Sequence, residues 1–240
     1  VFPLIFSRID HILIAGACLL PFSLLFVAQL DDPPERTKNK TSRKPEAIPT
    51  AAWLFLGAHF IICITEPGNL GFLNDYLNEL GGSPKLIGWF SGITGLIALI
   101  SLPLTGRWVD ARGVRWVLIL GFLSQIIRPL IVSTISDPNW LWVSHLCHGF
   151  GWAGREVGGL ILMTALIGTH RRATVVSLIV AVRMGGAMVG SFLMGFWADL
   201  FGYPTMFRLI SLLAFLSLPL LFVALSKARR PKESASADSD

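Results

Sequence analysis

Seven ionisable side chains lie inside long apolar stretches of the 240-residue sequence, and these residues could carry chemistry. They are Glu66, Arg128, His145, His148, Arg155, Glu156 and Arg183. A single Arg or Asp at the centre of a membrane helix costs about 2.5–3.5 kcal/mol on insertion scales. We therefore expect these side chains to face a polar cavity or one another. For each residue taken alone, snorkelling or a purely structural ion pair is the alternative.

The stretch 140–167 contains four polar or aromatic residues at spacings i, i+3, i+7 and i+10. This spacing places the four residues on one stripe of a helix. They are His145, His148, Trp152 and Arg155. At 1.5 Å per residue the stripe is about 15 Å long, about half of the hydrocarbon core. Glu156 is rotated by about 100° from Arg155. This rotation predicts that the two do not share a face and that Glu156 meets a neighbouring helix.

The two histidines of this stripe allow two interpretations. His145 and His148 could relay protons, because histidine changes its charge near neutral pH. The alternative is two core histidines that form hydrogen bonds with the backbone or with serine. No third ligand lies at a suitable spacing, so we predict no metal site and no other cofactor. The sequence also has no Ser/His/Asp arrangement at workable spacing, so we do not predict an enzyme.

Glu66 and Arg183 are expected to depend on each other. Glu66 precedes Pro67-Gly68, which predicts a kinked or broken helix whose freed backbone groups could bind a solute. Arg183 lies in the middle of the stretch 173–196 and needs an acidic partner. Glu66 and Glu156 are the only acids within the apolar stretches after residue 50, so one of them should pair with Arg183. Our hypothesis is that Glu66 does so.

The composition indicates the elements that position these residues. Apolar residues make up 53% of the chain and charged residues 15%, whereas a soluble domain carries about a quarter charged residues. We therefore predict an all-α, polytopic membrane protein. The net charge of +5 does not indicate nucleic-acid binding, because the basic residues lie in short links and in a tail.

Seven apolar stretches are long enough to span a bilayer, which takes about 20 residues. They cover residues 11–30, 51–73, 86–105, 116–134, 140–167, 173–196 and 205–226. The link 31–50 contains four prolines and five Lys or Arg, and it predicts a flexible tether between bundles. The tail 227–240 is basic and then rich in Ser, Ala and Asp, which predicts disorder.

The distribution of Lys and Arg predicts the orientation. Alternate links hold five (31–50), three (106–115), two (168–172) and four (227–240), which gives fourteen. The opposite set holds three at most, namely Arg8, Lys85 and Arg208. We therefore expect the tether, the link 106–115 and the C-terminus to be cytoplasmic, with six spans after the tether.

The link 106–115 combines glycines with charges at a regular spacing. Its motif residues are Gly106, Asp110, Arg112, Gly113 and Arg115. Gly106 should let two helices approach closely, and Gly113 can take the positive φ that separates two helices. Asp110 can pair with an arginine or accept hydrogen bonds from a helix N-terminus. We interpret this hairpin as a latch between membrane helices.

The spacing Gly-x-x-x-Asp-x-x-Gly followed by a basic residue resembles the cytoplasmic signature of the major facilitator superfamily of transporters. The resemblance implies secondary active transport of a small polar solute, sugar- or nucleoside-like, by alternating access and with proton coupling. It implies that residues 51–226 form a C-terminal six-helix bundle and residues 1–30 the last helix of a missing N-terminal bundle. The implied location is the inner cell membrane, and the implied partners are the solute, protons, lipid and the missing bundle.

The later spans resemble the lactose-permease branch of that superfamily. In register with it are Arg183, Gly195, Asp199 and Gly202, and also the segment Cys63-Ile-Thr-Glu66. The resemblance implies that His148 stands at a proton-coupling histidine and that Arg128 lies near an essential arginine. Gly95 stands where the branch has a sugar-binding glutamate, so galactoside transport is not implied.

A seven-span receptor or retinal-type protein is the alternative from another functional class, because the sequence contains seven stretches. Against it, the stretch 205–226 has no lysine for a Schiff base. The link 31–50 also separates one stretch from the other six.

Overall fold

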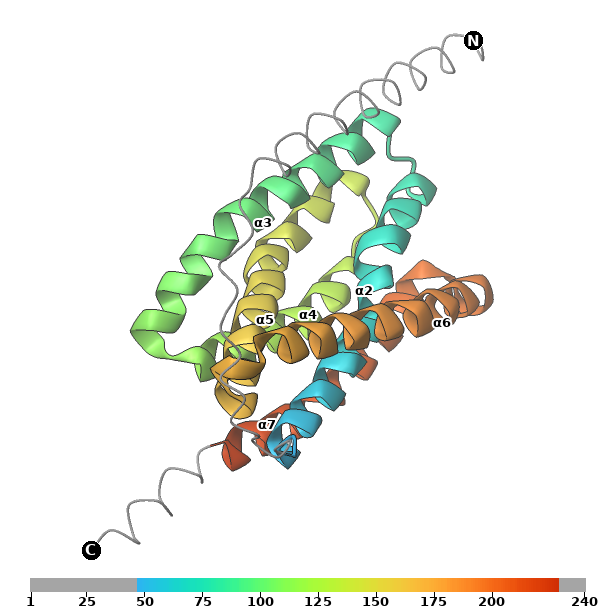
Figure 1. Ribbon diagram of the computed structural model, residues 1–240. Coiled ribbons are helices and arrows are strands. Elements are labelled where there is room, and N and C mark those ends of the chain that lie inside the picture. The colour runs from blue at the N-terminus through green and yellow to red at the C-terminus, as the bar shows by residue number, and fades with distance from the viewer. Residues whose placement is uncertain (1–46, 229–240) are drawn as a thin grey trace, which may run out of the picture. The chain divides into compact units, whose positions relative to one another are not determined.

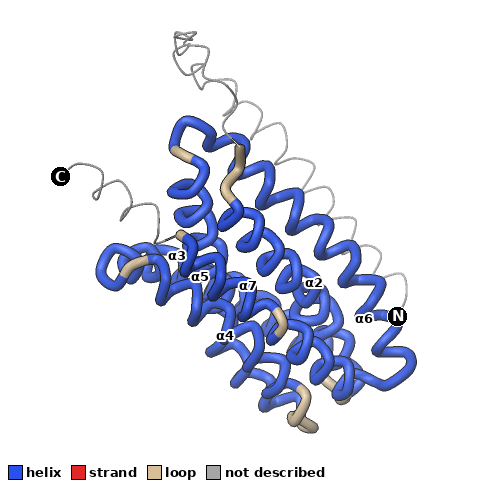
Figure 2. Tube along the Cα trace, turned by 90° about the horizontal axis from the view of Figure 1, so that it is seen from below, coloured by secondary structure: helices blue, strands red, loops and turns tan. Residues whose placement is uncertain are grey.

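A computed structural model describes residues 47–228 of the chain. The expected span 11–30, most of the link 31–50 and the tail after residue 228 therefore lie outside the described residues. All regular elements within 47–228 are helices, and short connections join them (Figures 1 and 2). This confirms the prediction of an all-α, polytopic chain.

Six α-helices and two short 3-10 helices make up the described part of the chain. They are α2 (Thr50–Glu79), α3 (Pro84–Arg112), α4 (Val114–Val132), η1 (Pro138–Trp142), α5 (Val143–Ile167), η2 (Thr169–Arg171), α6 (Arg172–Phe215) and α7 (Ser217–Lys227). Five stretches are long and apolar enough to cross a membrane, and the last one runs from Thr169 to Lys227.

That last stretch contains two of the predicted spans. Its 59 residues would measure about 90 Å as one straight helix, about three times the hydrocarbon core. Gly202 interrupts it with a φ of 73°, a value that glycine adopts without a steric penalty. Figure 1 shows α6 reaching one end of the bundle, turning and returning. The returning arm continues into α7, and the two together correspond to the expected span 205–226.

Local sequence explains the bounds of α3. Ser83 caps its N-terminus, because the Ser83 hydroxyl accepts a hydrogen bond from the backbone N–H of Leu86 at 3.2 Å. Pro84 occupies the first helical position, where its missing N–H is not needed. At the other end, Gly113 has a φ of 83° and separates α3 from α4. The helix thus extends through Arg112, so most of the expected link 106–115 is helical.

Glycines set the closest helix contacts. A Cβ at Gly186 of α6 would lie 2.6 Å from Cβ of Cys63 on α2, and one at Gly190 would overlap the backbone of Ile64. Gly154 and Gly158 of α5 similarly face α4. These two Gly-x-x-x-Gly pairs are small-residue faces at which the helices pack closely. The third pair, Gly88 and Gly92 on α3, has no described neighbour within 4 Å.

Two apolar cores lie between the helices. One core packs Phe55, Phe122, Met163, Ala214 and Leu221 together, and the other contains Tyr76, Leu141, Phe207 and Ile210. By contrast, large apolar side chains of α3 and α6 point outward. Trp89, Leu99, Met188 and Phe192 are all more than half exposed. An apolar exterior is expected of a chain whose surroundings are lipid.

Candidate functional site

Four charged side chains form a continuous network across α2, α5 and α6. Arg155 of α5 forms an ion pair with Glu66 of α2 through its Nη2 atom. The same Nη2 atom lies 3.0 Å from Oε1 of Glu156, the next residue of α5. Oε2 of Glu156 in turn lies 3.5 Å from Nη1 of Arg183 on α6. Acid and base therefore alternate along the network, and its formal charges sum to zero.

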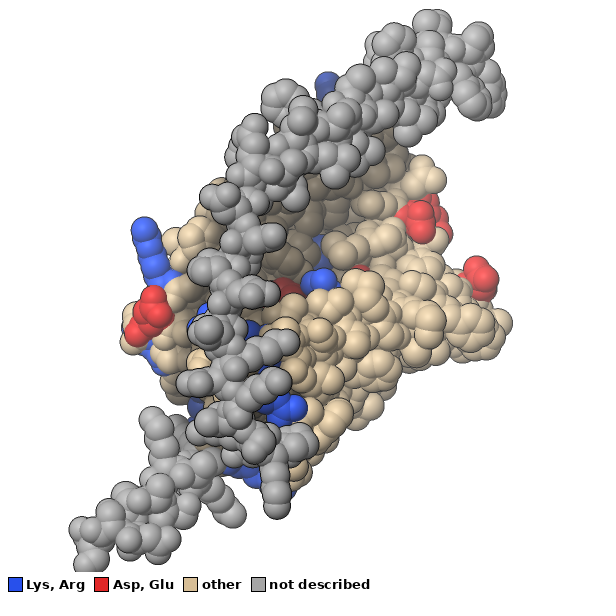
Figure 3. Space-filling view, viewed as in Figure 1, with Lys and Arg blue, Asp and Glu red and all other residues tan. Residues whose placement is uncertain are grey.

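Burial makes this pairing necessary. The side chain of Arg155 has no exposed surface, and an isolated buried charge is far costlier than a paired one. Two carboxylates compensate it. The side chains of Glu66, Glu156 and Arg183 remain 16%, 18% and 32% exposed. Figure 3 shows acidic and basic atoms exposed side by side near the middle of the face, with further charged groups toward its edges.

Small residues bring α6 close to α2, and α4 close to α5, behind the network. Gly186 lies one turn after Arg183 and packs on Cys63, which lies one turn before Glu66. Gly121 of α4 has so little room that a Cβ there would lie 2.9 Å from the backbone nitrogen of Arg155. The charged side chains therefore meet because glycines allow the backbones behind them to approach closely.

A second polar cluster joins α4 to α5. Nη1 of Arg128 lies 3.0 Å from Nδ1 of His148, and both side chains are buried. Because an arginine has only donors, Nδ1 of His148 accepts this bond and the imidazole proton sits on Nε2. His145, one turn earlier, packs its ring against Phe90 with a centroid separation of 3.9 Å. The rings of His145 and His148 are 6.4 Å apart.

A pair of amides lies between the two clusters. Nδ2 of Asn69 donates to Oε1 of Gln125 at 3.5 Å and to the backbone oxygen of Thr65 at 3.3 Å. Asn69 lies one turn after Glu66, and Gln125 lies one turn before Arg128. The sequence analysis assigned no role to either amide. Their spacing in the sequence could have indicated such a role. Each amide lies three residues from a charged residue of its own helix, which places the amide and the charge on the same face of that helix.

A cavity of about 300 Å³ opens between α2 and α3, with Arg128 at its wall. Its other lining residues are Asn69, Leu70, Gly71, Leu73, Asn74, Phe90, Ser91 and Thr94. The cavity therefore combines one cation, several hydrogen-bonding groups and an apolar part. No acidic side chain is among these lining residues.

The model of one protein family matches this chain, and its description is Major Facilitator Superfamily, over residues 55–239. The chain belongs to the Major Facilitator Superfamily. No curated protein matches the chain. Members of the superfamily are transporters and not enzymes, so this facilitator is a multi-pass membrane protein that acts in membrane transport. The assignment favours transport over the receptor or retinal-type alternative.

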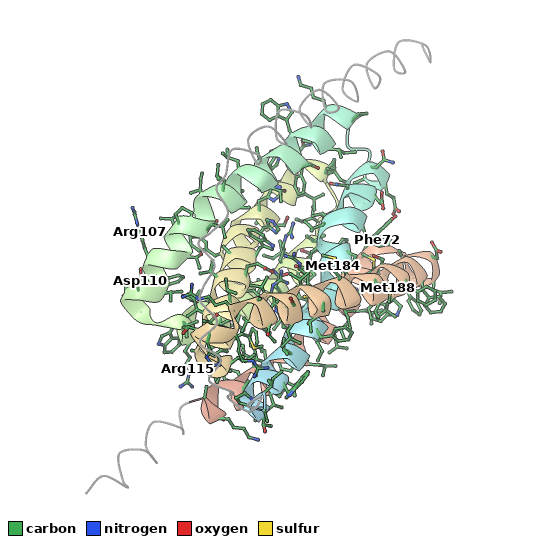
Figure 4. All side chains as sticks on the ribbon, viewed as in Figure 1. Phe72, Arg107, Asp110, Arg115, Met184 and Met188 are labelled. Atoms are coloured by element: carbon green, nitrogen blue, oxygen red, sulfur yellow. The ribbon has the colours of Figure 1, made fainter. Side chains whose placement is uncertain are left out.

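The motif expected to act as a latch lies where α3 meets α4 in this facilitator. Gly106, Asp110 and Arg112 lie on the last turns of α3, Gly113 makes the junction, and Arg115 lies in the first turn of α4. Figure 4 shows Arg107 and Asp110 near the end of α3 and Arg115 beyond the junction. Asp110 and Arg112 are exposed.

The expected close approach at Gly106 is not made by any described residue, because nothing lies within 4 Å of a Cβ placed there. The expected positive φ of Gly113 is confirmed. Within residues 47–228, Asp110 has no ion pair closer than 4.0 Å.

Two expectations about the charged residues are wrong. Glu66 pairs with Arg155 and not with Arg183, because α5 brings a fully buried arginine to Glu66. Arg155 and Glu156 contact each other although their side chains leave the helix in directions about 100° apart, because the long arginine side chain extends around the helix to the glutamate. Of the expected kink or break at Pro67, the break is absent, since α2 continues without interruption from Thr50 to Glu79. The expectation that Glu156 meets a neighbouring helix is confirmed by its contact with Arg183.

The structure also reveals a histidine that the sequence analysis did not consider. His59 of α2 is 1% exposed and stacks on the ring of Phe55 at 5.7 Å. Neither ring nitrogen has a hydrogen-bond partner among the described residues. His59 lies two turns before Glu66, so its spacing of seven residues places it on the network's face of α2.

Proposed function

We propose that this facilitator moves a small polar solute by alternating access and couples the movement to protons. The observation that carries the proposal is the network Glu66–Arg155–Glu156–Arg183, which joins three helices through ion pairs. Acid groups within membrane spans are costly and mark ion or proton paths. Here they are also partly exposed, so a proton can reach them.

Protonation of either glutamate would change the contacts between helices. A proton on Glu66 removes the charge that attracts Arg155 to α2, and a proton on Glu156 removes the link from α5 to α6. Binding of a proton therefore changes the relative free energies of two helix arrangements. Proton binding is coupled to the conformational change in this way.

The pair Arg128–His148 offers a second coupling point. His148 accepts a hydrogen bond at Nδ1, and a protonated imidazole has no acceptor. A proton on His148 would thus break its bond to Arg128 and place two cations beside each other. This supports the expectation from the lactose-permease resemblance that His148 takes part in proton coupling.

The domain arrangement of this transporter belongs to the same proposal. Residues 51–226 would act as one six-helix bundle against a second bundle that covers the exposed apolar faces of α3 and α6. The Asp110 motif would then lie on the cytoplasmic side, with the C-terminus also cytoplasmic in the inner cell membrane. The fourteen basic residues of one set of links support this orientation.

Uptake into proteoliposomes that contain the full-length protein tests the proposal. A panel of labelled sugars, nucleosides and small organic anions would be offered with and without an imposed pH gradient. We expect uphill uptake of at least one solute, and its loss when a protonophore is added. Uptake that needs sodium and ignores the protonophore would contradict proton coupling.

Two variants separate coupling from binding. Glu66→Gln and Glu156→Gln should lose uphill uptake, yet they should retain exchange of labelled for unlabelled solute, since exchange needs no net proton release. Glu79→Gln, an exposed glutamate at the end of the same helix α2, is the matched control. Equal loss of uptake in all three variants would contradict a specific role of the network.

A further inference from the structure

The cavity between α2 and α3 contains an arginine that has no acidic partner among the described residues. Arg128 is 1% exposed, and its only hydrogen bond among the described residues joins Nη1 to Nδ1 of His148. Its Nε atom is buried and has no hydrogen-bond partner within residues 47–228. A guanidinium cannot lose its proton in a protein, so this positive charge persists at all working pH values. By contrast, Arg155 and Arg183 each have a carboxylate.

Two further hydrogen-bond donors face the same cavity. Asn74 of α2 and Ser91 of α3 line it, and neither side chain has a hydrogen bond within residues 47–228. The other side-chain donors that line the cavity are already engaged, whereas the acceptor Oδ1 of Asn69 is buried and has no partner among the described residues. The hydroxyl of Thr94 donates to the backbone oxygen of Phe90 at 2.9 Å, and the amide hydrogens of Asn69 go to Thr65 and Gln125.

The charge and donor pattern selects one class of ligand. Arg128 is a buried cation with a free donor atom. The amide of Asn74 and the hydroxyl of Ser91 line the same cavity, and no acidic side chain is among its lining residues. A neutral sugar would leave that charge uncompensated, whereas a carboxylate would neutralise it and accept its hydrogen bonds. Leu70, Leu73 and Phe90 also line the cavity, and they suit an apolar or aromatic group.

We propose that this cavity is the binding site for a small organic anion, a monocarboxylate with an apolar or aromatic group, whose carboxylate contacts Arg128. The inference rests on the proposed transport function and narrows its solute. It replaces the expected sugar- or nucleoside-like solute with a charged one. Phe90 then connects the anion site to the histidine pair, because it lines the cavity and its ring also packs on His145.

Binding to the purified full-length protein in detergent tests the site separately from transport. The probe is benzoate, and benzamide is its neutral counterpart of the same shape. Isothermal titration calorimetry should detect binding of benzoate and an affinity for benzamide that is at least about tenfold lower. Hydrogen bonds to charged groups change an affinity by about one to two powers of ten. Equal affinity for both compounds would overturn the proposal. Binding of inorganic phosphate without benzoate would also overturn it.

Variants locate the binding. Arg128→Gln should lose about 10- to 100-fold in benzoate affinity, and Arg128→Lys should keep part of it because it keeps the charge. Lys85→Gln is the matched control, since Lys85 is exposed on α3 outside the cavity lining. Full affinity in Arg128→Gln would overturn the proposal. Should Arg128→Gln fail to fold, Asn74→Leu and Ser91→Ala decide, because both residues lie at the cavity surface and each should weaken benzoate binding several-fold.

The two proposals fail in different ways. Uptake of a neutral sugar by a protein that does not bind benzoate would overturn the anion site and leave the transport function intact. Benzoate binding without uptake of any solute under a pH gradient would support the site and contradict the transport mechanism.

Discussion

Glu66 and Arg155 form an ion pair that joins α2 to α5, at a point where the arginine has no exposed surface. Removing one partner of a buried pair leaves an uncompensated charge, which typically costs about 3–5 kcal/mol. Glu66→Gln should therefore lower the melting temperature strongly. Here Arg155 keeps its contact with Glu156, so the cost should fall at or below the lower end of this range.

Removal of both partners should restore part of the stability. In Glu66→Gln/Arg155→Gln the remaining pair of Glu156 and Arg183 is neutral by itself. Thermal unfolding of the two single variants and the double variant measures the coupling between the residues. Glu79→Gln should unfold like the unmodified protein. A double variant no more stable than Glu66→Gln would contradict the pairing.

Two glycines of the same motif type should respond in opposite ways to alanine. Gly190 lies against the backbone of Ile64, so Gly190→Ala forces α6 away from α2 and should cost about 1–3 kcal/mol. Gly88 has no described neighbour within 4 Å, so Gly88→Ala should be neutral or stabilising through its higher helix propensity. Melting temperatures in detergent compare the two. Tolerance of Gly190→Ala would show that the helices are not in backbone contact.

The reversal at Gly202 should not accept another residue. Its φ of 73° lies in the left-handed region, where an L-residue costs about 1–2 kcal/mol. Gly202→Ala should therefore reduce stability, as measured by the yield of folded protein and its melting temperature. Gly195→Ala is the control, since Gly195 is helical and its nearest neighbour, Cζ of Phe72, is 3.7 Å from a built Cβ. An equal effect of both changes would contradict the conformational explanation.

Asp110→Ala should impair conformational cycling and leave membrane insertion intact, if the α3–α4 junction acts as a latch. We expect uptake to fall about tenfold, which corresponds to about 1.4 kcal/mol in the barrier between states. Expression in the membrane fraction should not change, because Asp110 is exposed and belongs to no described ion pair. Asp75→Ala, an exposed aspartate on α2, is the control. Unchanged uptake in Asp110→Ala would contradict the latch.

Hydropathy alone predicted the helices of the described region well, because a run of apolar residues in lipid has few other backbone solutions. The residues expected to span at 51–73 and 86–105 lie in α2 and α3, although both helices extend further. The extensions are polar or mixed in sequence. A cap such as Ser83 and a positive-φ residue such as Gly113 set the bounds, which hydropathy does not register.

Partners of the buried charges were harder to predict. Sequence spacing places Arg155 on the stripe of His148, yet each side chain contacts a different neighbour, Glu66 of α2 for one and Arg128 of α4 for the other. Spacing along one helix does not reveal which helix lies beside it. The length of arginine adds a second uncertainty, because Arg155 reaches a glutamate whose Cα direction differs by about 100°.

The seam between α2 and α6 has a mechanical consequence. At Gly186 and Gly190 main chain touches main chain, and no layer of side chains separates them. For one helix to slide along another, the side chains between them must exchange rotamers. This contact has no such layer of side chains, so α2 and α6 resist sliding and should move together as one rigid unit. Among the described helices, rearrangement meets less resistance at sparse contacts such as the one between α2 and α3, beside the cavity of Arg128.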